Sequence, residues 1–197
     1  MAPRFPPPKR PTPRQHDENT LVLDDDMQPI APGSGKRGRI ARTGLLPVGY
    51  WKDPEKSAKT FVVVNGKRYT IPGDFAMLEA DGSIVLLGRG SQCINTGGEK
   101  VFPEEVEEAL KTHPAIEDAL VFGIPDEKWG QAVTAVAEAR SDVSEEDLIA
   151  HVKAHHAHYK APKRVLIVEK VPRAPNGKAD YDSARALAAG AGIASAA

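Results

Sequence analysis

A glycine-rich loop that leads directly into a helix dominates this sequence, from Gly88 to Leu110. Glycine permits a sharp turn or a close approach to a ligand, because it carries no side chain. Pro103 suits the first position of a helix, and the glutamates after it carry the charge that a helix N-terminus favours. Apolar residues then recur at helical spacing. The sequence therefore predicts a strand end, a polar loop and an amphipathic helix over residues 103–113 that packs on a core.

Residues 20–88 show the pattern of antiparallel hairpins. Asn65-Gly66 separates two runs of strand-forming residues, and this dipeptide favours the type I′ turn of a tight hairpin. Asp81-Gly82 separates a second pair of such runs. The predicted strands are 21–23, 61–64, 67–71, 75–79 and 84–87. We expect this part of the chain to be mostly β.

Strands and helices alternate in the remainder of the chain. The predicted strands are 116–124, 132–139 and 164–168, and the predicted helices are 103–113, 144–158 and 182–189. The first two of these strands are expected to be antiparallel neighbours. Antiparallel strands covered by two to three helices predict an α+β fold for this part of the chain, preceded by the mostly β segment.

Both ends of the chain differ from its centre. Residues 1–15 are rich in proline and contain basic side chains without an acid. Such a segment cannot bury enough apolar surface to fold by itself, so we expect a disordered tail over residues 1–19. The functional alternative is a proline-rich ligand for a partner, or a basic anchor. Residues 190–197 are expected to form a frayed end.

Composition excludes several classes of protein. A hydrophobic content of 41% and a charged content of 27% are ordinary for a globular domain. The net charge of -1 provides no general attraction to nucleic acid. We find neither a signal-peptide core nor an apolar run near the roughly 18 residues of a membrane span. With Cys93 as its only cysteine, the chain is expected to be cytoplasmic, without nucleic acid or a membrane span.

Three candidate motifs lack neighbouring residues that their proposed chemistry would require. Residues 32–36 resemble a phosphate loop, but the required upstream glycine and the Ser or Thr after the lysine are missing. His151, His155 and His158 share one face of the predicted helix, yet they lack the arrangement of a zinc site, so we expect no metal ligands. No base accompanies Cys93, which makes a nucleophilic role improbable.

Three other motifs occur in a fixed order: YTIPGD at 69–74, Arg89 followed by INTGGEKVFPEEVE at 94–107, and PRAPNGK at 172–178. Together they resemble the adenylate-forming enzymes, and their residues are most similar to those of long-chain fatty-acid or steroid-acid CoA ligases of actinobacterial type. The likeness covers roughly residues 20–188. It implies the following division: residues 20–88 end a large N-terminal AMP-binding domain, 89–91 form a hinge, and 92–189 form a C-terminal lid domain.

The resemblance implies a nucleotide site. Lys178 follows the turn pair Asn176-Gly177, which exposes the next side chain, and it corresponds to the lysine of the adenylation half-reaction. Its ammonium would stabilise the charge that develops as a carboxylate joins the α-phosphate of ATP. Asp74 would accept hydrogen bonds from the ribose hydroxyls, and Arg89 would contact ribose or phosphate. The alternatives are a solvated lysine and an aspartate that only closes its own turn.

The same resemblance implies which residues form the hinge and which bind the coenzyme. Gly90 and Ser91 would absorb the rotation of the lid, although many relatives carry Asp or Lys where Ser91 stands. Gly97 and Gly98 would form the wall of the pantetheine tunnel. Lys100 stands where relatives often carry an arginine facing the phosphates of CoA, and it keeps the charge without the bidentate fork.

The implied reaction joins a carboxylic acid to CoA, with ATP converted to AMP and pyrophosphate. Its cofactors would be ATP/AMP, CoA and Mg²⁺, the last held by the N-terminal part. Because this sequence contains neither the phosphate loop nor an acyl pocket, we expect it to need a complementary N-terminal AMP-binding domain. Two alternatives stay open: a lid from another adenylating enzyme of peptide-synthetase or luciferase type, and a non-enzymatic interaction fragment. Trp129 could border the CoA path, but core packing is favoured.

Overall fold

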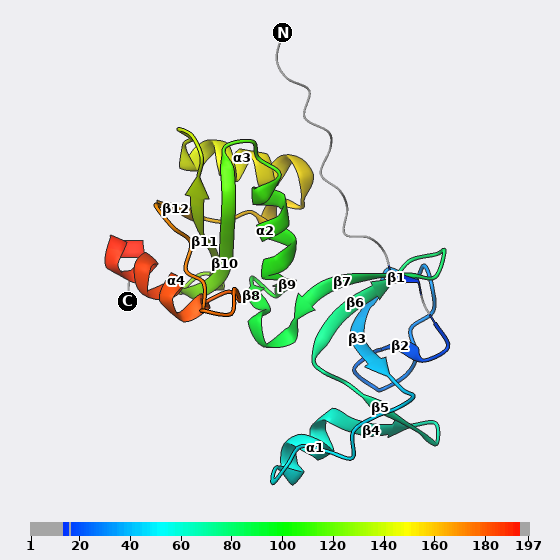
Figure 1. Cartoon of the computed structure of the whole chain (residues 1–197). Helices are drawn as coiled ribbons and strands as arrows, with labels where there is room; N and C mark the ends of the chain where they lie inside the picture. Colours follow the sequence, from blue (N-terminus) through cyan, green and yellow to red (C-terminus); the bar gives the residue numbers. More distant parts are fainter. Residues whose placement is uncertain (1–13, 16, 194–197) are drawn as a thin grey trace. The chain divides into compact units, whose positions relative to one another are not determined.

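The computed structural model describes residues 14, 15 and 17–193, which divide into two compact units between Ser91 and Gln92 (Figure 1). We call residues 14–91 the β unit and residues 92–193 the lid unit. Most of the predicted tail, residues 1–13 and 16, lies outside the described residues, as do residues 194–197. Arg14–Gln15 form a short strand, β1, so the tail predicted for residues 1–19 does not extend unbroken over them.

The β unit is built on a sheet of seven strands with the order β1-β7-β6-β3-β5-β4, in which β2 pairs with β3. The strands are β1 (Arg14–Gln15), β2 (Thr20–Leu23), β3 (Arg37–Arg42), β4 (Phe61–Val64), β5 (Lys67–Thr70), β6 (Asp74–Leu78) and β7 (Ser83–Arg89). All of their pairings are antiparallel. The prediction of a mostly β segment is therefore confirmed, and both predicted hairpins are present.

The turn between β4 and β5 has the expected geometry. Asn65 and Gly66 have φ values of 49° and 77°, which the type I′ turn requires at both central positions. The strand β3 and the helix α1 (Pro54–Thr60) were not predicted. The helix buries no residue, and its N-terminus is set locally by Asp53, whose side chain accepts a hydrogen bond from the Lys56 amide.

The lid unit is built on a sheet of five strands with the order β10-β11-β8-β9, in which β12 pairs with β11. Its strands are β8 (Ile94–Thr96), β9 (Glu99–Val101), β10 (Ile116–Asp126), β11 (Gly130–Ala139) and β12 (Arg164–Val168). Its helices are α2 (Pro103–Lys111), α3 (Glu145–His155), the short η2 (His158–Lys160), α4 (Tyr181–Ala188) and the terminal turn η3 (Ala189–Ile193). The predicted α+β fold is confirmed, and β10 and β11 are antiparallel as expected.

Two details of the lid unit differ from the prediction. The strand β12 runs parallel to β11, a pairing that the sequence pattern did not reveal. The predicted polar loop contains the hairpin β8–β9, whose strands are only three residues long. Such short strands carry too few residues for an alternating pattern to be recognised.

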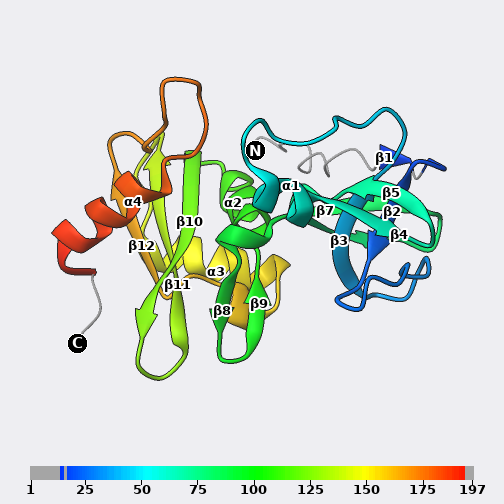
Figure 2. The same cartoon turned by 90° about the horizontal axis from the view of Figure 1, so that it is seen from below.

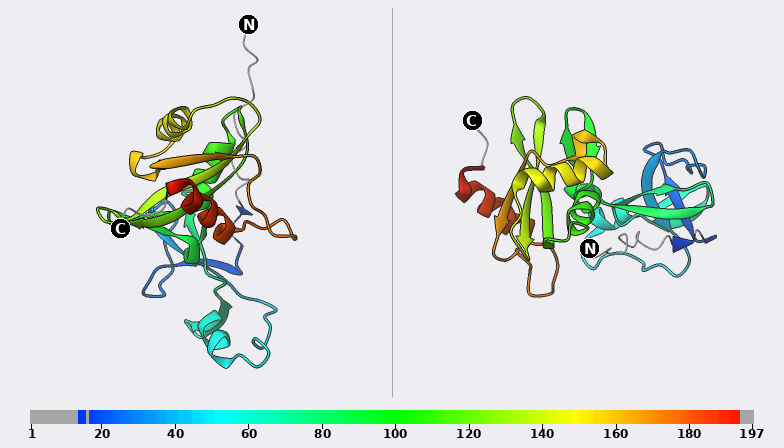
Figure 3. Two further views of the ribbon diagram at one scale, coloured as in Figure 1. Left: turned by 90° about the vertical axis from the view of Figure 1, so that its left-hand side faces the viewer. Right: turned by 90° about the horizontal axis from the view of Figure 1, so that it is seen from above.

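Alternate residues of the central strands bury opposite faces of the lid sheet. Ala119 and Val121 of β10 pack in one apolar cluster with residues of α2 and α3. Leu120 and Phe122 of the same strand pack in a second cluster with residues of α4. Figure 3 shows α3 and α4 on opposite sides of the strands. The period of two in a strand thus builds two cores from one sheet.

Leu148 offers a test of the first of these cores. Its side chain is 0% exposed, whereas Leu187 on α4 is 43% exposed. Leu148→Ala should lower the free energy of unfolding by about 2–5 kcal/mol, because it removes buried methyl groups and leaves a cavity. Leu187→Ala is the matched control, with an expected change below about 1 kcal/mol. Urea unfolding followed by circular dichroism measures both, and equal losses would contradict the assigned core.

Candidate functional site

Lys178 lies at the exposed turn of the segment between β12 and α4, residues 169–180, which we call the lysine loop. Figure 2 shows this loop, in orange, projecting beyond the ends of the lid strands. Inside the loop the Gly177 amide donates to the Ala174 carbonyl at 2.8 Å, and the Ala174 amide donates to the Lys178 carbonyl at 2.9 Å. The Lys178 amide donates to Asn176 Oδ1 at 3.1 Å. This closed turn directs the Lys178 side chain toward solvent.

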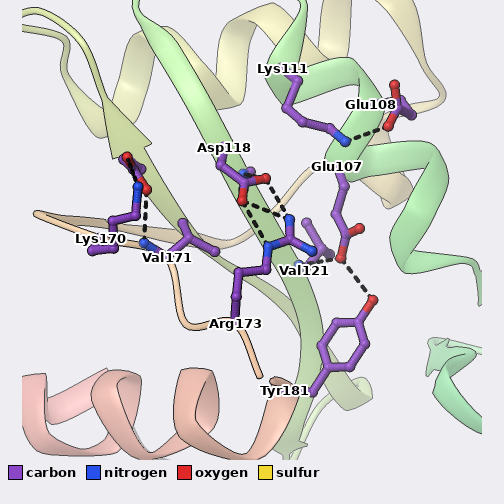
Figure 4. A network of polar contacts seen from close by, with 11 residues as sticks. Glu107, Glu108, Lys111, Asp118, Val121, Lys170, Val171, Arg173 and Tyr181 are labelled. Carbon is purple, nitrogen blue, oxygen red and sulfur yellow. Dashed lines mark hydrogen bonds and ion pairs between the residues drawn. The ribbon is translucent and has the colours of Figure 1, made fainter. Parts of the chain in front are cut away.

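Two acidic side chains tie the start of the lysine loop to the sheet (Figure 4). Arg173 makes a two-pronged ion pair with Asp118 of β10, with Nε 2.9 Å from Oδ2 and Nη2 2.6 Å from Oδ1. Glu138 of β11 accepts hydrogen bonds from the Val171 amide and the Lys170 ammonium, both at 3.1 Å. These donors hold the pKa of Glu138 below its usual value, the Val171 amide most of all.

Glu107 of α2 binds the residue that opens α4 (Figure 4). Its side chain is 7% exposed, and its Oε1 accepts hydrogen bonds from the Val121 amide at 2.9 Å and the Tyr181 hydroxyl at 3.0 Å. Burial raises the pKa of Glu107 to about 7. Burial, followed by the charge of Glu107, raises the pKa of Tyr181 above its ordinary value. The end of the lysine loop is thereby joined to α2.

Asp74 and Arg89 stand opposite each other at the ends of β6 and β7 in the β unit. Arg89 Nε lies 3.4 Å from Asp74 Oδ1, so the two predicted nucleotide residues form an ion pair. The Arg89 side chain is 68% exposed and that of Asp74 is 33% exposed, so both can be reached from solvent. The strand register therefore brings together two residues that the sequence separates by a hairpin.

The predicted pivot follows directly on Arg89. The Gly90 amide donates to the Gly73 carbonyl at 3.0 Å. A Cβ on Gly90 would lie 2.6 Å from the ring of Phe75, which excludes any larger residue there unless the ring shifts. Ser91 belongs to a single turn of 3-10 helix, η1 (Gly90–Gln92), at the division between the two units.

Gly97 and Gly98 form the tip of the β8–β9 hairpin, and Gly97 packs beside Trp129. Their φ values are 60° and 85°, and the Gly97 amide donates to the Trp129 carbonyl at 2.8 Å. A Cβ on Gly97 would lie 2.8 Å from the indole ring. The ammonium groups of Lys128 and Lys163 lie 4.9 and 5.1 Å from the centre of that ring. Trp129 is 39% exposed, so the core position favoured by the sequence is wrong.

The surface around this tip is basic and partly aromatic. Lys100 lies in β9, two residues beyond Gly98, and is exposed. Sequence reasoning did not select Lys128 and Lys163, because nothing in the local pattern shows that both lysines meet one indole ring. A positive surface with an exposed ring is suited to an anionic ligand that carries an aromatic group.

The histidines do not form the predicted row. The ring of His151 lies 5.1 Å from that of His113 and 4.7 Å from that of His155, whereas His158 belongs to η2 and not to α3. Burial, followed by neighbouring positive charge, lowers the pKa of His151. Within residues 14–15 and 17–193, no group of three or more His, Cys, Asp or Glu side chains could hold a metal ion.

Comparisons with known proteins show what this chain is similar to in sequence and in fold. Residues 105–178 match the family model of the AMP-binding enzyme C-terminal domain. This chain matches the C-terminal part of AMP-forming acyl-CoA ligases. It is 54% identical over 167 residues to the 3-oxocholest-4-en-26-oate–CoA ligase of Rhodococcus rhodochrous, a match that covers 84% of this chain and 30% of that protein. The chain thus spans about a third of the length of the ligases that it matches.

Solved structures show the same fold. The amide bond synthetase McbA from Marinactinospora thermotolerans aligns with a TM-score of 0.76 at 29% identity. The alignment covers 85% of this chain and 34% of the McbA chain. The o-succinylbenzoate CoA synthetase MenE from Bacillus subtilis, in complex with its acyl-adenylate intermediate, has a TM-score of 0.73 at 29% identity, covering 82% and 33%. No helix in the described part of this ligase-like chain is long and apolar enough to cross a membrane.

The buried acid gives the lid a predicted pH dependence. Because the pKa of Glu107 is raised from 4.5 to about 7 on folding, its favourable contribution is complete below pH 4.5 and is lost as the pH rises through 7. The loss is at most about 3 kcal/mol, since each pKa step is worth about 1.36 kcal/mol. Between pH 5 and 8, the free energy of unfolding measured with urea should therefore fall for the wild-type lid by about 2–3 kcal/mol relative to Glu107→Gln. Glu117→Gln, at an exposed acid, is the control, and parallel curves for wild type and Glu107→Gln would refute the prediction.

Proposed function

We propose that this chain supplies the lid and the adjoining nucleotide-side strands of an AMP-forming acyl-CoA ligase. The proposed reaction first joins a carboxylate to the α-phosphate of ATP, which releases pyrophosphate. The thiol of CoA then attacks the acyl-adenylate and releases AMP. The observation that carries this proposal is Lys178, exposed on a turn that is anchored at both ends, in a chain that matches CoA ligases.

Lys178 is the proposed catalytic residue of the first half-reaction. An ammonium on a long, flexible stem can bridge the carboxylate and the α-phosphate as negative charge develops on both. Among the residues that the structure describes, no carboxylate forms an ion pair with this ammonium, whereas Lys170 of the same loop is paired with Glu138. The charge of Lys178 is therefore available to a ligand.

Asp74 and Arg89 are the proposed nucleotide residues. A carboxylate that is one-third exposed can accept hydrogen bonds from both ribose hydroxyls, and the ion pair with the neighbouring guanidinium orients it. Gly90 and Ser91 would form the pivot between the adenylating and thioester-forming poses. The close approach of Gly90 to Phe75 gives a physical reason for a glycine at this position of the pivot.

CoA is the proposed ligand of the hairpin tip. Gly97 and Gly98 leave the backbone free of side chains where the pantetheine arm would pass. Lys100, with Lys128 and Lys163 beside the exposed ring of Trp129, provides positive charge for the phosphates. The Mg²⁺ that accompanies ATP is proposed to be held by the N-terminal part.

The acid is proposed to be a fatty or steroid acid. The Rhodococcus rhodochrous relative is named for 3-oxocholest-4-en-26-oate, and a relative from Mycolicibacterium smegmatis, 53% identical over 167 residues, is named for medium- and long-chain fatty acids as well. The proposed partner is an N-terminal AMP-binding domain with the acyl pocket. The name of McbA supports a second candidate, adenylation with an amine as the acceptor.

The test of Lys178 uses a hybrid ligase, in which this chain replaces the matching C-terminal part of the Rhodococcus rhodochrous enzyme. Lys178→Ala should lower pyrophosphate exchange with fatty and steroid acids by at least about 100-fold, because a preorganised charge is lost from the transition state. Lys153→Ala, at an exposed lysine of α3, should leave the exchange unchanged. Full exchange by the Lys178→Ala hybrid, or robust exchange by this chain alone, would overturn the proposal.

The test of the CoA tip separates the two half-reactions. Gly97→Ala should slow thioester formation from supplied acyl-adenylate by about tenfold or more and leave pyrophosphate exchange near the wild-type rate, since the new methyl group displaces Trp129. Gly66→Ala is a matched control: its φ of 77° imposes similar backbone strain at a distant hairpin. Transfer of the acyl group to an amine but not to CoA would favour the second candidate. Equal slowing of both half-reactions would contradict a CoA role for Gly97.

A further inference from the structure

The hydrogen bonds inside the lysine loop fix its shape but not its direction. The bonds among Ala174, Gly177 and Lys178 begin and end within the loop. The bond from the Asp180 amide to the Pro172 carbonyl at 3.3 Å closes the base of the same loop. A self-closed hairpin of this kind can swing as one body unless other elements hold it.

Besides the contacts of Glu138 with Lys170 and Val171 at the start of the loop, two side-chain contacts flank the turn and hold it, one before Lys178 and one after it (Figure 4). Before the turn, Arg173 binds Asp118 through two prongs, and the two side chains are 33% and 23% exposed. After the turn, the Tyr181 hydroxyl donates to Glu107 at 3.0 Å. A two-pronged, charge-assisted pair fixes the relative direction of its partners, and a partly buried hydrogen bond is stronger than one in water.

Both contacts connect the lysine loop to the strand β10. Asp118 belongs to β10, and Glu107 accepts the amide of Val121, three residues further along β10. The two ends of the lysine loop are thereby fixed to one rigid, doubly covered strand. A turn that is held at both ends from one strand has a defined direction relative to that strand.

We propose that Asp118 with Arg173, and Glu107 with Tyr181, are positioning residues that aim Lys178 for the adenylation step. This inference rests on the proposed function of Lys178. None of the four side chains needs to touch the nucleotide. A displacement of about 1 Å at a reacting group can reduce a rate by as much as about 100-fold, so the loss of either contact should be visible in the rate.

The test uses the hybrid ligase with Asp118→Asn and Tyr181→Phe. Each should lower kcat of pyrophosphate exchange roughly tenfold, with KM for ATP little changed, because the lysine is misaimed while the binding groups remain. Thioester formation from supplied acyl-adenylate should stay at the wild-type rate. The matched controls are Glu117→Gln, next to Asp118 on β10, and Tyr159→Phe, at an exposed tyrosine, and both should leave both half-reactions unchanged.

The outcomes separate this inference from the proposed function. An inactive wild-type hybrid would refute the proposed function. An active hybrid that loses exchange with Lys178→Ala but not with Asp118→Asn or Tyr181→Phe would overturn the positioning role. Equal slowing of both half-reactions, together with a lowered unfolding midpoint, would also overturn it, since a general weakening of the lid is then sufficient.

A second measurement tests the aim of the loop without catalysis. A nitroxide label can be attached to the full chain carrying Lys178→Cys and Cys93→Ser. The label should become more mobile when Asp118→Asn or Tyr181→Phe is added, and should not change with Glu117→Gln or Tyr159→Phe. Unchanged mobility in all four would overturn the inference, whatever the hybrid ligase does.

Discussion

The antiparallel ladder between β10 and β11 is the contact on which the lid unit depends. Its register runs without a further shift from the Asp118–Glu138 pair to the Asp126–Gly130 pair. Each residue of β10 is thereby assigned to one face, so a slip by one position would exchange the cluster under α2 and α3 with the cluster under α4. The same register places Asp118 and the Val121 amide where the lysine loop is anchored. The packing of the lid unit and the proposed position of Lys178 therefore both depend on the register between β10 and β11.

Much of this frame could be predicted from sequence, because its signals are local. The longer strands of the lid, β10, β11 and β12, have strong apolar patterns, and the Asn65-Gly66 turn of the β unit follows from the backbone freedom of those two residues. The contacts that anchor the lysine loop could not be predicted in the same way. Arg173 and Asp118 are 55 residues apart, and Tyr181 and Glu107 are 74 apart, so no periodicity joins them. Glu107 follows an acidic first turn and looks like the other glutamates of α2 in the sequence, and only the packing of that helix shows that it is buried.

Trp129 shows a second reason why sequence reasoning stopped short. A tryptophan usually lies in a core, because its large apolar area favours burial. Here the carbonyl of Trp129 is bound by the Gly97 amide, and its ring fills the space that a side chain on Gly97 would need. The ring therefore stays near the surface with two lysines beside it. The positions of Gly97 and Trp129 are therefore explained only by the contact between them.

The burial of Glu107 is costly for a carboxylate, and that cost suggests why the contact with Tyr181 is specific. A buried acid requires hydrogen-bond donors, and the Val121 amide and the Tyr181 hydroxyl supply two to a single oxygen. If Tyr181 moved away, Glu107 would lose one of these donors and could not regain it from solvent, because it is 7% exposed. An apolar pair could hold α4 against α2 at lower cost, but it would tolerate sliding. A hydrogen bond of fixed length does not, so this contact defines the position of the residue that ends the lysine loop as well as its attachment.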